Sequence, residues 1–247
     1  MILLVDVGNS YLKWATWNSG KLGKVCRCPH RKNQRETVDP WGWSKLQPPK
    51  KLVICNVAGE VLAQALTKDA KNYWGITPDW FRSAPIGHGV RNGYSQPLTL
   101  GADRWAALVA AASTPHPSLL IADCGTALTL DGLSRDNVHL GGWIVPGLTG
   151  MRAALLGNTA GIATSAGPAE AVLAQDTGSG VASGTLQALA AVVDRAAQCL
   201  AGQLGEAVSV LLTGGDGKLL LPHLNTPTHF DEDLVLRGLA VAACQPE

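Results

Sequence analysis

Two short stretches of the sequence place an aspartate at the end of an apolar run, in a position suited to phosphate chemistry. Residues 2–10 read ILLVDVGNS and residues 119–127 read LLIADCGTA, so Asp6 and Asp123 each precede a glycine and small residues. A glycine lets the backbone approach an oxygen closely and present N–H donors to it. A carboxylate repels a phosphate, so it fits there when a cation such as hydrated Mg²⁺ lies between them. Either aspartate alone could instead cap its turn.

The segment GADRW, residues 101–105, is a second candidate for chemistry. Asp103 and Arg104 fall at the start of a predicted Ala-rich helix, residues 102–113. Asp103 could accept a proton from an attacking hydroxyl, while Arg104 binds a carboxylate of the acceptor. Alternatively, Asp103 only complements the helix dipole, an effect of roughly 0.3–1 kcal/mol. The residue types alone leave both interpretations open.

The two aspartate stretches indicate an internal repeat. An offset of 117 residues aligns Asp6 with Asp123 and Gly8 with Gly125, and the proline-containing stretch 114–118 separates two halves of similar length. Chance similarity between two buried strands is the alternative. Repeated units imply repeated architecture, so we expect two related domains, each beginning with a hairpin that has an aspartate at its tip.

The pattern of apolar and turn residues predicts the elements that position these side chains. The predicted strands are 2–7, 11–17, 51–57, 118–125, 127–133 and 207–213, and the predicted helices are 60–74, 102–113 and 185–205. The glycine-rich stretch 141–147 is predicted to form a turn, and residues 21–50 an irregular segment. A strand followed by a helix, as at 51–74, favours an α/β fold.

Composition narrows the class of protein. The chain has 247 residues, 46% of them hydrophobic, with a formal net charge of +1, so we expect a globular protein with no nucleic-acid partner. No apolar run reaches the ~18 residues of a membrane span and the N-terminus does not resemble a signal peptide, so we expect no membrane partner and a cytoplasmic location. Cys26, Cys28 and His30 only loosely resemble a metal-binding tract, because no second ligand pair accompanies them.

Several motifs, taken in order, resemble the type III pantothenate kinase family, which includes proteins labelled Bvg accessory factor homologues. They are DVGNS at 6–10, GADRW at 101–105, DCGTALTLD at 123–131, GGWIVPG at 141–147, LTGGDG at 212–217 and DLVLRGLA at 233–240. The resemblance implies an α/β fold of two ribonuclease-H-like domains, duplicated as in acetate and sugar kinases, Hsp70 and actin, with a nucleotide cleft between them. We expect an N-terminal domain at 1–115, with the first phosphate loop and the catalytic base. A C-terminal domain at 116–247 would carry the second phosphate loop, a turn facing adenosine and a dimerisation helix.

The resemblance also implies a reaction. The family phosphorylates pantothenate with ATP to give 4'-phosphopantothenate, the first step of coenzyme A biosynthesis, as a homodimer that uses Mg²⁺ and a monovalent cation, K⁺ or NH₄⁺. Two alternatives remain from the residues themselves. One is another small-molecule phosphotransferase of the same fold, and the other is a non-enzymatic ATP-binding regulator.

The family's functional residues carry over to matching positions of this sequence. Asp103 corresponds to the catalytic base, Asp6 to a residue that holds Mg²⁺ through water, and Asp123 to the residue that holds the monovalent cation. The positions that match ATP contacts are Asp6, Val7, Gly8, Asn9, Ser10, Tyr11, Leu12, Lys13 and Thr126. The positions that match pantothenate contacts are Tyr94, Gly101, Ala102, Asp103, Arg104 and Thr177.

Overall fold

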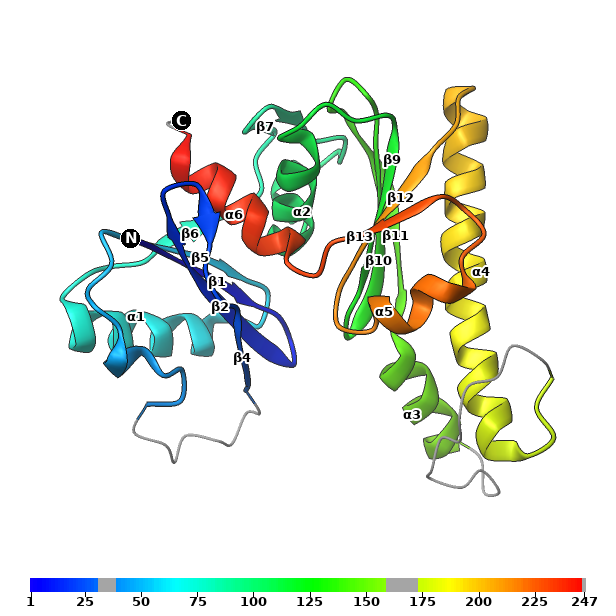
Figure 1. Cartoon of the computed structure of the whole chain (residues 1–247), viewed down its shortest axis with the longest axis horizontal. Helices are drawn as coiled ribbons and strands as arrows, with labels where there is room; N and C mark the ends of the chain where they lie inside the picture. The colour runs from blue at the N-terminus through cyan, green and yellow to red at the C-terminus, as the bar shows by residue number, and fades with distance from the viewer. Residues whose placement is uncertain (31–38, 159–172, 246–247) are drawn as a thin grey trace. The chain divides into compact units, whose positions relative to one another are not determined.

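The computed structural model describes residues 1–30, 39–158 and 173–245 and divides into two compact units (Figure 1). The first unit consists of Met1–Thr114 with Asp233–Glu247, and the second of Pro115–Glu232. Each unit has its own mixed sheet, and the strands of the two sheets follow the same order and directions. The duplication expected from the repeated sequence is therefore present in the fold.

The sheet of the first unit is built around the hairpin that carries Asp6. Its strands are β1 (Ile2–Val7), β2 (Tyr11–Asn18), β3 (Lys21–Leu22), β4 (Cys26–Pro29), β5 (Lys51–Asn56) and β6 (Asp79–Phe81). The order is β3-β2-β1-β5-β6, with β4 pairing with β2. Because β1, β5 and β6 are parallel, their carboxyl ends meet at the same edge of the sheet, where Asp6 lies.

Helices cover the first sheet on both faces. The helices are α1 (Glu60–Trp74), α2 (Ala102–Ala112) and α6 (Leu234–Cys244), with short elements η1 (Trp43–Lys45), β7 (Ile86–Gly87), β8 (Val90–Arg91) and η2 (Pro97–Thr99). The apolar residues of β1 that include Leu3 and Val5 form a core with Leu66 of α1 and Trp43. The helices α2 and α6 pack against each other and contact β1 and β5, so α2 delivers its first turn to the sheet.

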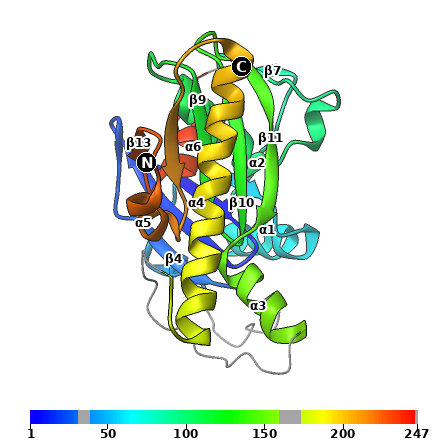
Figure 2. The same cartoon turned by 90° about the vertical axis from the view of Figure 1, so that its right-hand side faces the viewer.

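The sheet of the second unit repeats this order. Its strands are β9 (Leu119–Cys124), β10 (Ala127–Leu133), β11 (His139–Pro146), β12 (Ser209–Thr213) and β13 (Thr228–Phe230), in the order β11-β10-β9-β12-β13. The other elements are α3 (Leu148–Asn158), α4 (Thr177–Leu204), α5 (Gly217–Leu220) and η3 (Leu221–His223). The long helix α4 lies along this sheet (Figure 2), where Leu186, Leu189 and Val193 enter its core.

The structure confirms the expected α/β class and most predicted elements, with three differences. Residues 141–147 were predicted to form a turn, which is wrong, because β11 runs through them; the bulge in its pairing with β10 and the positive φ of Gly141 accommodate the glycines. In the stretch 21–50, the described residues 21–30 and 39–50 are also less irregular than predicted, since they contain β3, β4 and η1, while 31–38 lie outside the described residues. Helix α4 begins at Thr177 rather than near 185, because the Asp176 carboxylate accepts the Ser179 N–H and caps it.

The division into units also differs from the sequence-based domains at the C-terminus. The boundary between Thr114 and Pro115 lies next to the expected one, but α6 groups with the first unit rather than with the second. The reason is its packing on α2: a Cβ on Gly238 would lie 1.9 Å from the Ala106 carbonyl oxygen. This close approach of two helix backbones requires glycine, and the order of elements along the chain does not reveal it.

Candidate active site

The first hairpin turn, residues 8–10, follows Asp6 at the carboxyl end of β1. The Gly8 N–H donates to the Tyr11 carbonyl oxygen at 3.1 Å, which closes the turn. Asn9 and Ser10 are exposed, whereas Asp6 is half-buried and pairs in register with Cys55 of β5. The turn thus presents backbone and small polar groups beside a carboxylate, as the sequence predicts for a phosphate loop.

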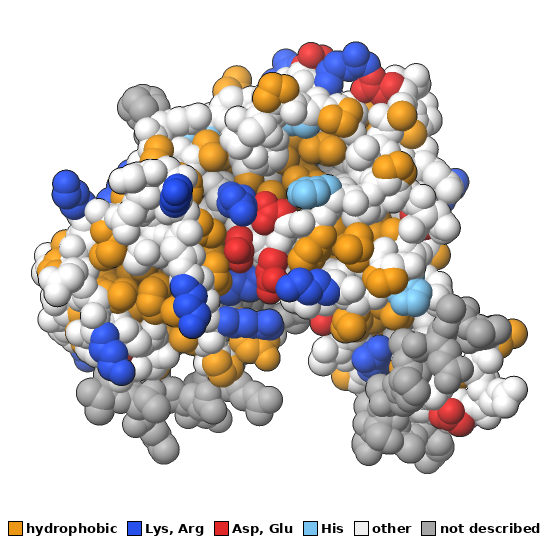
Figure 3. All heavy atoms as spheres, viewed as in Figure 1, with side chains coloured by type: hydrophobic (Ala, Val, Ile, Leu, Met, Phe, Trp, Pro, Cys, Tyr) orange, Lys and Arg blue, Asp and Glu red, His pale blue; other side chains and the backbone are white. Residues whose placement is uncertain are grey.

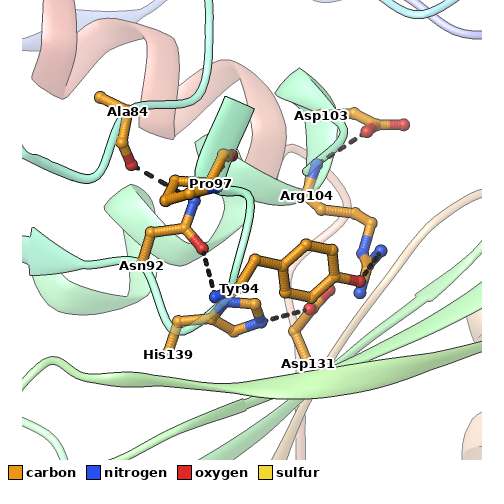
Figure 4. Close-up of polar contacts among 8 residues, drawn as sticks. All are labelled: Ala84, Asn92, Tyr94, Pro97, Asp103, Arg104, Asp131 and His139. Carbon is orange, nitrogen blue, oxygen red and sulfur yellow. Dashed lines mark hydrogen bonds and ion pairs between the residues drawn. The ribbon is translucent and has the colours of Figure 1, made fainter. Parts of the chain in front are cut away.

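Asp103 lies in the first turn of α2, with its carboxylate folded back over the start of the helix (Figure 4). Its Oδ1 accepts the Arg104 N–H at 2.8 Å. A Cβ placed on Gly101 would lie only 2.6 Å from this same Oδ1. Gly101 therefore leaves the space that the Asp103 carboxylate occupies.

Asp6 and Asp103 both act on one buried thiol of the first unit. Burial raises the pKa of Cys55 well above its ordinary value, and the negative charges of Asp6 and Asp103 raise it further. Both carboxylates are therefore near the end of β5, although 97 residues separate them in the sequence. Two carboxylates in one region supply oxygen ligands of the kind that Mg²⁺ prefers.

Arg104 is fixed by a chain of hydrogen bonds (Figure 4). Its guanidinium donates from Nη1 to the Tyr94 hydroxyl at 2.9 Å, and the residue is buried. The Tyr94 N–H donates to Oδ1 of Asn92 at 3.0 Å, and the Asn92 amide donates to the carbonyl oxygens of Ala84 and Pro97 at 3.2 and 3.1 Å. Asn92 thus positions Tyr94, a role that its place in a glycine- and proline-rich segment did not suggest.

A pocket of about 670 Å³ lies in the first unit between α1, β6 and η2. Gly101 and Ala102 line it, together with Asn56, Ser83 and Leu100 among others. Its size is within the range of small-molecule sites, and its lining mixes apolar and polar groups. The structure thus places two of the predicted acceptor residues on a pocket wall.

The second hairpin turn, residues 125–126, repeats the first in outline. The Gly125 N–H donates to the Ala127 carbonyl oxygen at 3.0 Å, Thr126 is exposed, and Asp123 is half-buried. Gly147 approaches this turn so closely that a Cβ there would lie 2.3 Å from the Gly125 carbonyl oxygen. The Gly147 N–H donates to the Thr126 carbonyl oxygen at 3.1 Å, so the turn is held by main-chain groups.

A second carboxylate accompanies Asp123. Burial raises the pKa of Cys124, and the charges of Asp123 and Asp216 raise it further. The Asp216 N–H donates to the Cys124 carbonyl oxygen at 3.0 Å. Between them Gly214 adopts a φ of +93°, and a Cβ there would lie 2.4 Å from Oδ1 of Asp123. Asp216 and Gly214 belong to the LTGGDG motif, which the sequence linked to adenosine rather than to Asp123.

Thr177, the other residue of the second unit predicted to contact substrate, lies apart from the sheet. It is exposed in the first turn of α4, whose first turns extend past the strands beside α3 (Figure 1). Arg152 of α3 donates to the Thr185 hydroxyl at 3.1 Å and to the Ala182 carbonyl at 3.3 Å, which joins the two helices.

Two general features of the described residues are the distribution of charged side chains and the apolar character of the helices. On the face drawn in Figure 3, basic side chains are scattered among hydrophobic and uncharged ones. Within the described parts of the chain, none of the helices is both long enough and apolar enough to cross a membrane.

Comparison with known structures identifies the fold class. A Baf family protein from Campylobacter jejuni matches 96% of this chain and 95% of its own with a TM-score of 0.60 at 22% identity. A protein described as a 2-dehydro-3-deoxygalactonokinase from Sinorhizobium meliloti matches 98% of each chain with a TM-score of 0.55 at 16% identity. The duplicated sheets and their acidic tips therefore define a protein with the fold of actin and the sugar kinases.

Comparison of sequences identifies the family within that fold. The family model described as type III pantothenate kinase matches residues 2–198. The type III pantothenate kinase of Nitrosococcus oceani is 37% identical over 98% of this chain and 94% of its own, and that of Nitrosospira multiformis is 35% identical over 98% and 91%. This chain belongs to the type III pantothenate kinase family.

Proposed function

We propose that this chain transfers a phosphoryl group from ATP to pantothenate, giving 4'-phosphopantothenate in the first step of coenzyme A biosynthesis. The observation that carries the proposal is the position of Asp103, at the start of α2 and near the same thiol as Asp6. A phosphoryl transferase needs little covalent chemistry from its side chains, and most of its work is to position reactants and stabilise charge. A base beside a phosphate loop fits that requirement.

Asp103 is the general base of the proposed reaction. Its carboxylate accepts the proton of the pantothenate hydroxyl as that oxygen attacks the γ-phosphate, and the bond from the γ-phosphorus to the bridging oxygen of ADP breaks. Arg104, oriented by Tyr94, binds the pantothenate carboxylate, since a guanidinium suits a carboxylate geometrically. Gly101 and Ala102 form the wall against which the acceptor lies, and Thr177 adds a further contact.

ATP is bound by the stretch Asp6–Lys13, with Thr126 as an additional contact. Membership of a kinase family implies ATP and a divalent cation. The donor set fits Mg²⁺, because this ion keeps several waters and takes one or two protein carboxylates. Asp6 would hold the ion through water, and the bound ion supplies positive charge that offsets the charge of the phosphates.

Asp123 is proposed to bind a monovalent cation, K⁺ or NH₄⁺. Asp216 near the same thiol supports this, because two carboxylates favour a cation beside them. Activity is expected in KCl or NH₄Cl and is expected to fall steeply in NaCl at the same ionic strength. Equal rates in the three salts would contradict the proposed role of Asp123.

The protein is proposed to act as a homodimer. The edge strand β11 exposes two large apolar side chains, Trp143 and Ile144, at 44% and 61% of their surface, and a second copy would cover them. Light scattering is expected to give twice the chain mass, and Trp143→Glu is expected to lower it. A monomer at micromolar concentration would contradict this part of the proposal.

A coupled assay of ADP release tests the proposed reaction. The protein is incubated with ATP, Mg²⁺ and K⁺ and a panel of small hydroxyl acids, of which pantothenate alone is expected to give turnover. Turnover with another acceptor would favour a different phosphotransferase of this fold. ATP binding without any turnover would favour a regulator.

A further inference from the structure

The short strand β4 lies directly beside the first hairpin turn. It pairs with β2 so that Tyr11 is opposite Pro29 and Leu12 is opposite Cys28. The residue after the strand, His30, therefore lies next to the turn itself. Its N–H donates to the Ser10 carbonyl oxygen at 3.3 Å, and its Nε2 lies 2.6 Å from the Gly8 carbonyl oxygen.

The partner of Nε2 fixes the role of the ring. A main-chain carbonyl oxygen only accepts hydrogen bonds, so Nε2 must carry a hydrogen and donate it. The two contacts of His30 reach the carbonyls of Gly8 and Ser10, on either side of the exposed Asn9. Both carbonyls are thereby directed toward β4.

Two further contacts flank the turn. On the β5 side, the Val57 N–H donates to the Val7 carbonyl oxygen at 3.0 Å, just before the turn. On the β4 side, Arg27 lies 3.7 Å above the ring of Tyr11, in a cation–π contact just after it. His30 bonds to the main chain of the turn between these two points.

The placement of His30 also explains a pattern that resembles a metal tract. Successive side chains of a strand point to opposite faces, so Cys26, Cys28 and His30 share one face. Cys26 and Cys28 pack against the core of the first unit, while Arg27 and Pro29 are exposed. The spacing Cys-x-Cys-x-His is therefore the inward face of β4 continued to the turn.

We propose that His30 is a positioning residue of the first phosphate loop, which holds the Gly8–Ser10 backbone in the conformation that binds the phosphates of ATP. The inference rests on the proposed function and deepens it. It assigns a role to His30 in the stretch 21–50, which the sequence pattern predicted only to be irregular. A loop fixed in its bound conformation loses less entropy when the nucleotide binds, so the loss of His30 weakens nucleotide binding rather than the chemical step.

The test compares His30→Leu with His30→Gln in the full-length protein. Gln keeps a donor N–H at about the same reach, whereas Leu fills the space without one. Since a hydrogen bond is worth about 0.5–1.5 kcal/mol net, His30→Leu is expected to raise the KM for ATP and the Kd for ADP by about two- to twelvefold. The kcat and the KM for pantothenate are expected to change little, and His30→Gln is expected to recover most of the loss.

His229→Leu is the matched control, because His229 is an exposed histidine of the second unit. It is expected to leave every constant unchanged. An unchanged KM for ATP and Kd for ADP in a folded His30→Leu protein would overturn the inference, as would a loss of kcat alone. If His30→Leu unfolds, His30→Gln is compared with the unchanged protein instead. Near-equal nucleotide affinity of these two proteins supports a donor role for His30. A loss of affinity as large as tenfold in His30→Gln excludes that role. Failure of the unchanged protein to turn over pantothenate would count against the proposed function, whereas the ADP titration still tests the loop.

Discussion

The two hairpin turns have the same plan but are held by different groups. Each follows a half-buried aspartate, and each aspartate acts with a second carboxylate on a buried cysteine: Asp6 with Asp103, and Asp123 with Asp216. The first hairpin turn is bonded by both the ring and the main-chain N–H of His30, whereas the second is bonded by the main-chain N–H of Gly147. The two units thus share a turn that follows an aspartate, but they differ in the groups that bond to this turn.

The difference concerns how much change each turn tolerates. A Cβ on Gly8 would meet its nearest atom, the Tyr11 carbonyl oxygen, at an ordinary 3.5 Å. Cβ atoms on Gly147 and Gly214 would lie 2.3 and 2.4 Å from the carbonyl oxygens of Gly125 and Cys124, in the second turn and just before it. There is therefore no space for a Cβ on Gly147 or Gly214 beside the second turn. The first turn has space for a Cβ on Gly8, and it is bonded by His30, a side chain that can be substituted.

The largest expected effect distinguishes Asp103 from Asp216, the carboxylates that act together with Asp6 in the first unit and with Asp123 in the second. Asp103→Asn removes the proposed base and is expected to lower kcat by about 10²–10⁴, the usual contribution of general-base catalysis. Asp216→Asn is expected to lower kcat by less than about tenfold, because no proton transfer is assigned to that carboxylate. Steady-state kinetics with saturating ATP and pantothenate measures both. Equal losses in the two variants would mean that the two tips do not differ in chemistry as argued.

The next effect tests the steric difference between the turns. Gly214→Ala combines a positive φ with a Cβ 2.4 Å from the Cys124 carbonyl oxygen, so it is expected to lower the free energy of unfolding by roughly 2–4 kcal/mol. Gly8→Ala is expected to cost less than about 1 kcal/mol. Urea unfolding followed by circular dichroism gives both values, and a larger loss for Gly8→Ala would reverse the comparison.

Much of the fold was predictable because the apolar pattern is strong where strands are buried. The runs 2–7 and 119–124 contain a single charged residue each, and each is a central strand of its sheet. The edge strand β11 was missed, because it contains glycines and half of its residues are exposed. The packing of α6 within the first unit was also not predicted. It depends on the contact of Gly238 with Ala106, and these residues are far apart in the sequence.

The candidate site was predictable only where a residue type carries its own chemistry. Asp6, Asp103 and Asp123 stood out because carboxylates at strand ends and helix starts are unusual in apolar surroundings. Asn92 and His30 did not, because their partners are main-chain carbonyls that any sequence supplies. Residues that position others are recognised from contacts, and contacts require the fold.

A third prediction concerns α4, which lies between β11 and β12 in the second unit. Asp194 of α4 accepts hydrogen bonds from the N–H groups and side chains of Asn225 and Thr226, at 2.8–3.2 Å. Burial alone would raise the pKa of the Asp194 carboxyl, but these hydrogen bonds outweigh it and lower the pKa below its ordinary value. Asp194→Asn is expected to cost about 1–3 kcal/mol in the free energy of unfolding at pH 7.

The pH dependence of this contribution has a definite sign. Because the folded-state pKa lies below the unfolded value of about 4, the stabilisation is complete above pH 4 and is lost as the pH falls through the folded-state pKa. The difference in stability between the unchanged protein and Asp194→Asn is therefore expected to shrink under acid conditions. Urea midpoints measured from pH 7 to pH 3 test this, and a difference that grows on acidification would contradict the assignment.

The smallest expected effect tests whether Gly101 is needed to leave space for the Asp103 carboxylate rather than for folding. The Cβ of Gly101→Ala would lie 2.6 Å from Oδ1 of Asp103, so the carboxylate must move, while the backbone keeps its place because the φ of −55° suits alanine. We expect kcat to fall by about three- to thirtyfold, as for a displaced general base, with a change in unfolding free energy within about 0.5 kcal/mol. Since Asp103→Asn removes the same base, the decrease in kcat caused by Asp103→Asn is expected to be smaller in the Gly101→Ala protein than in the unchanged protein. A fully additive double variant would show that Gly101 acts on the acceptor and not through Asp103.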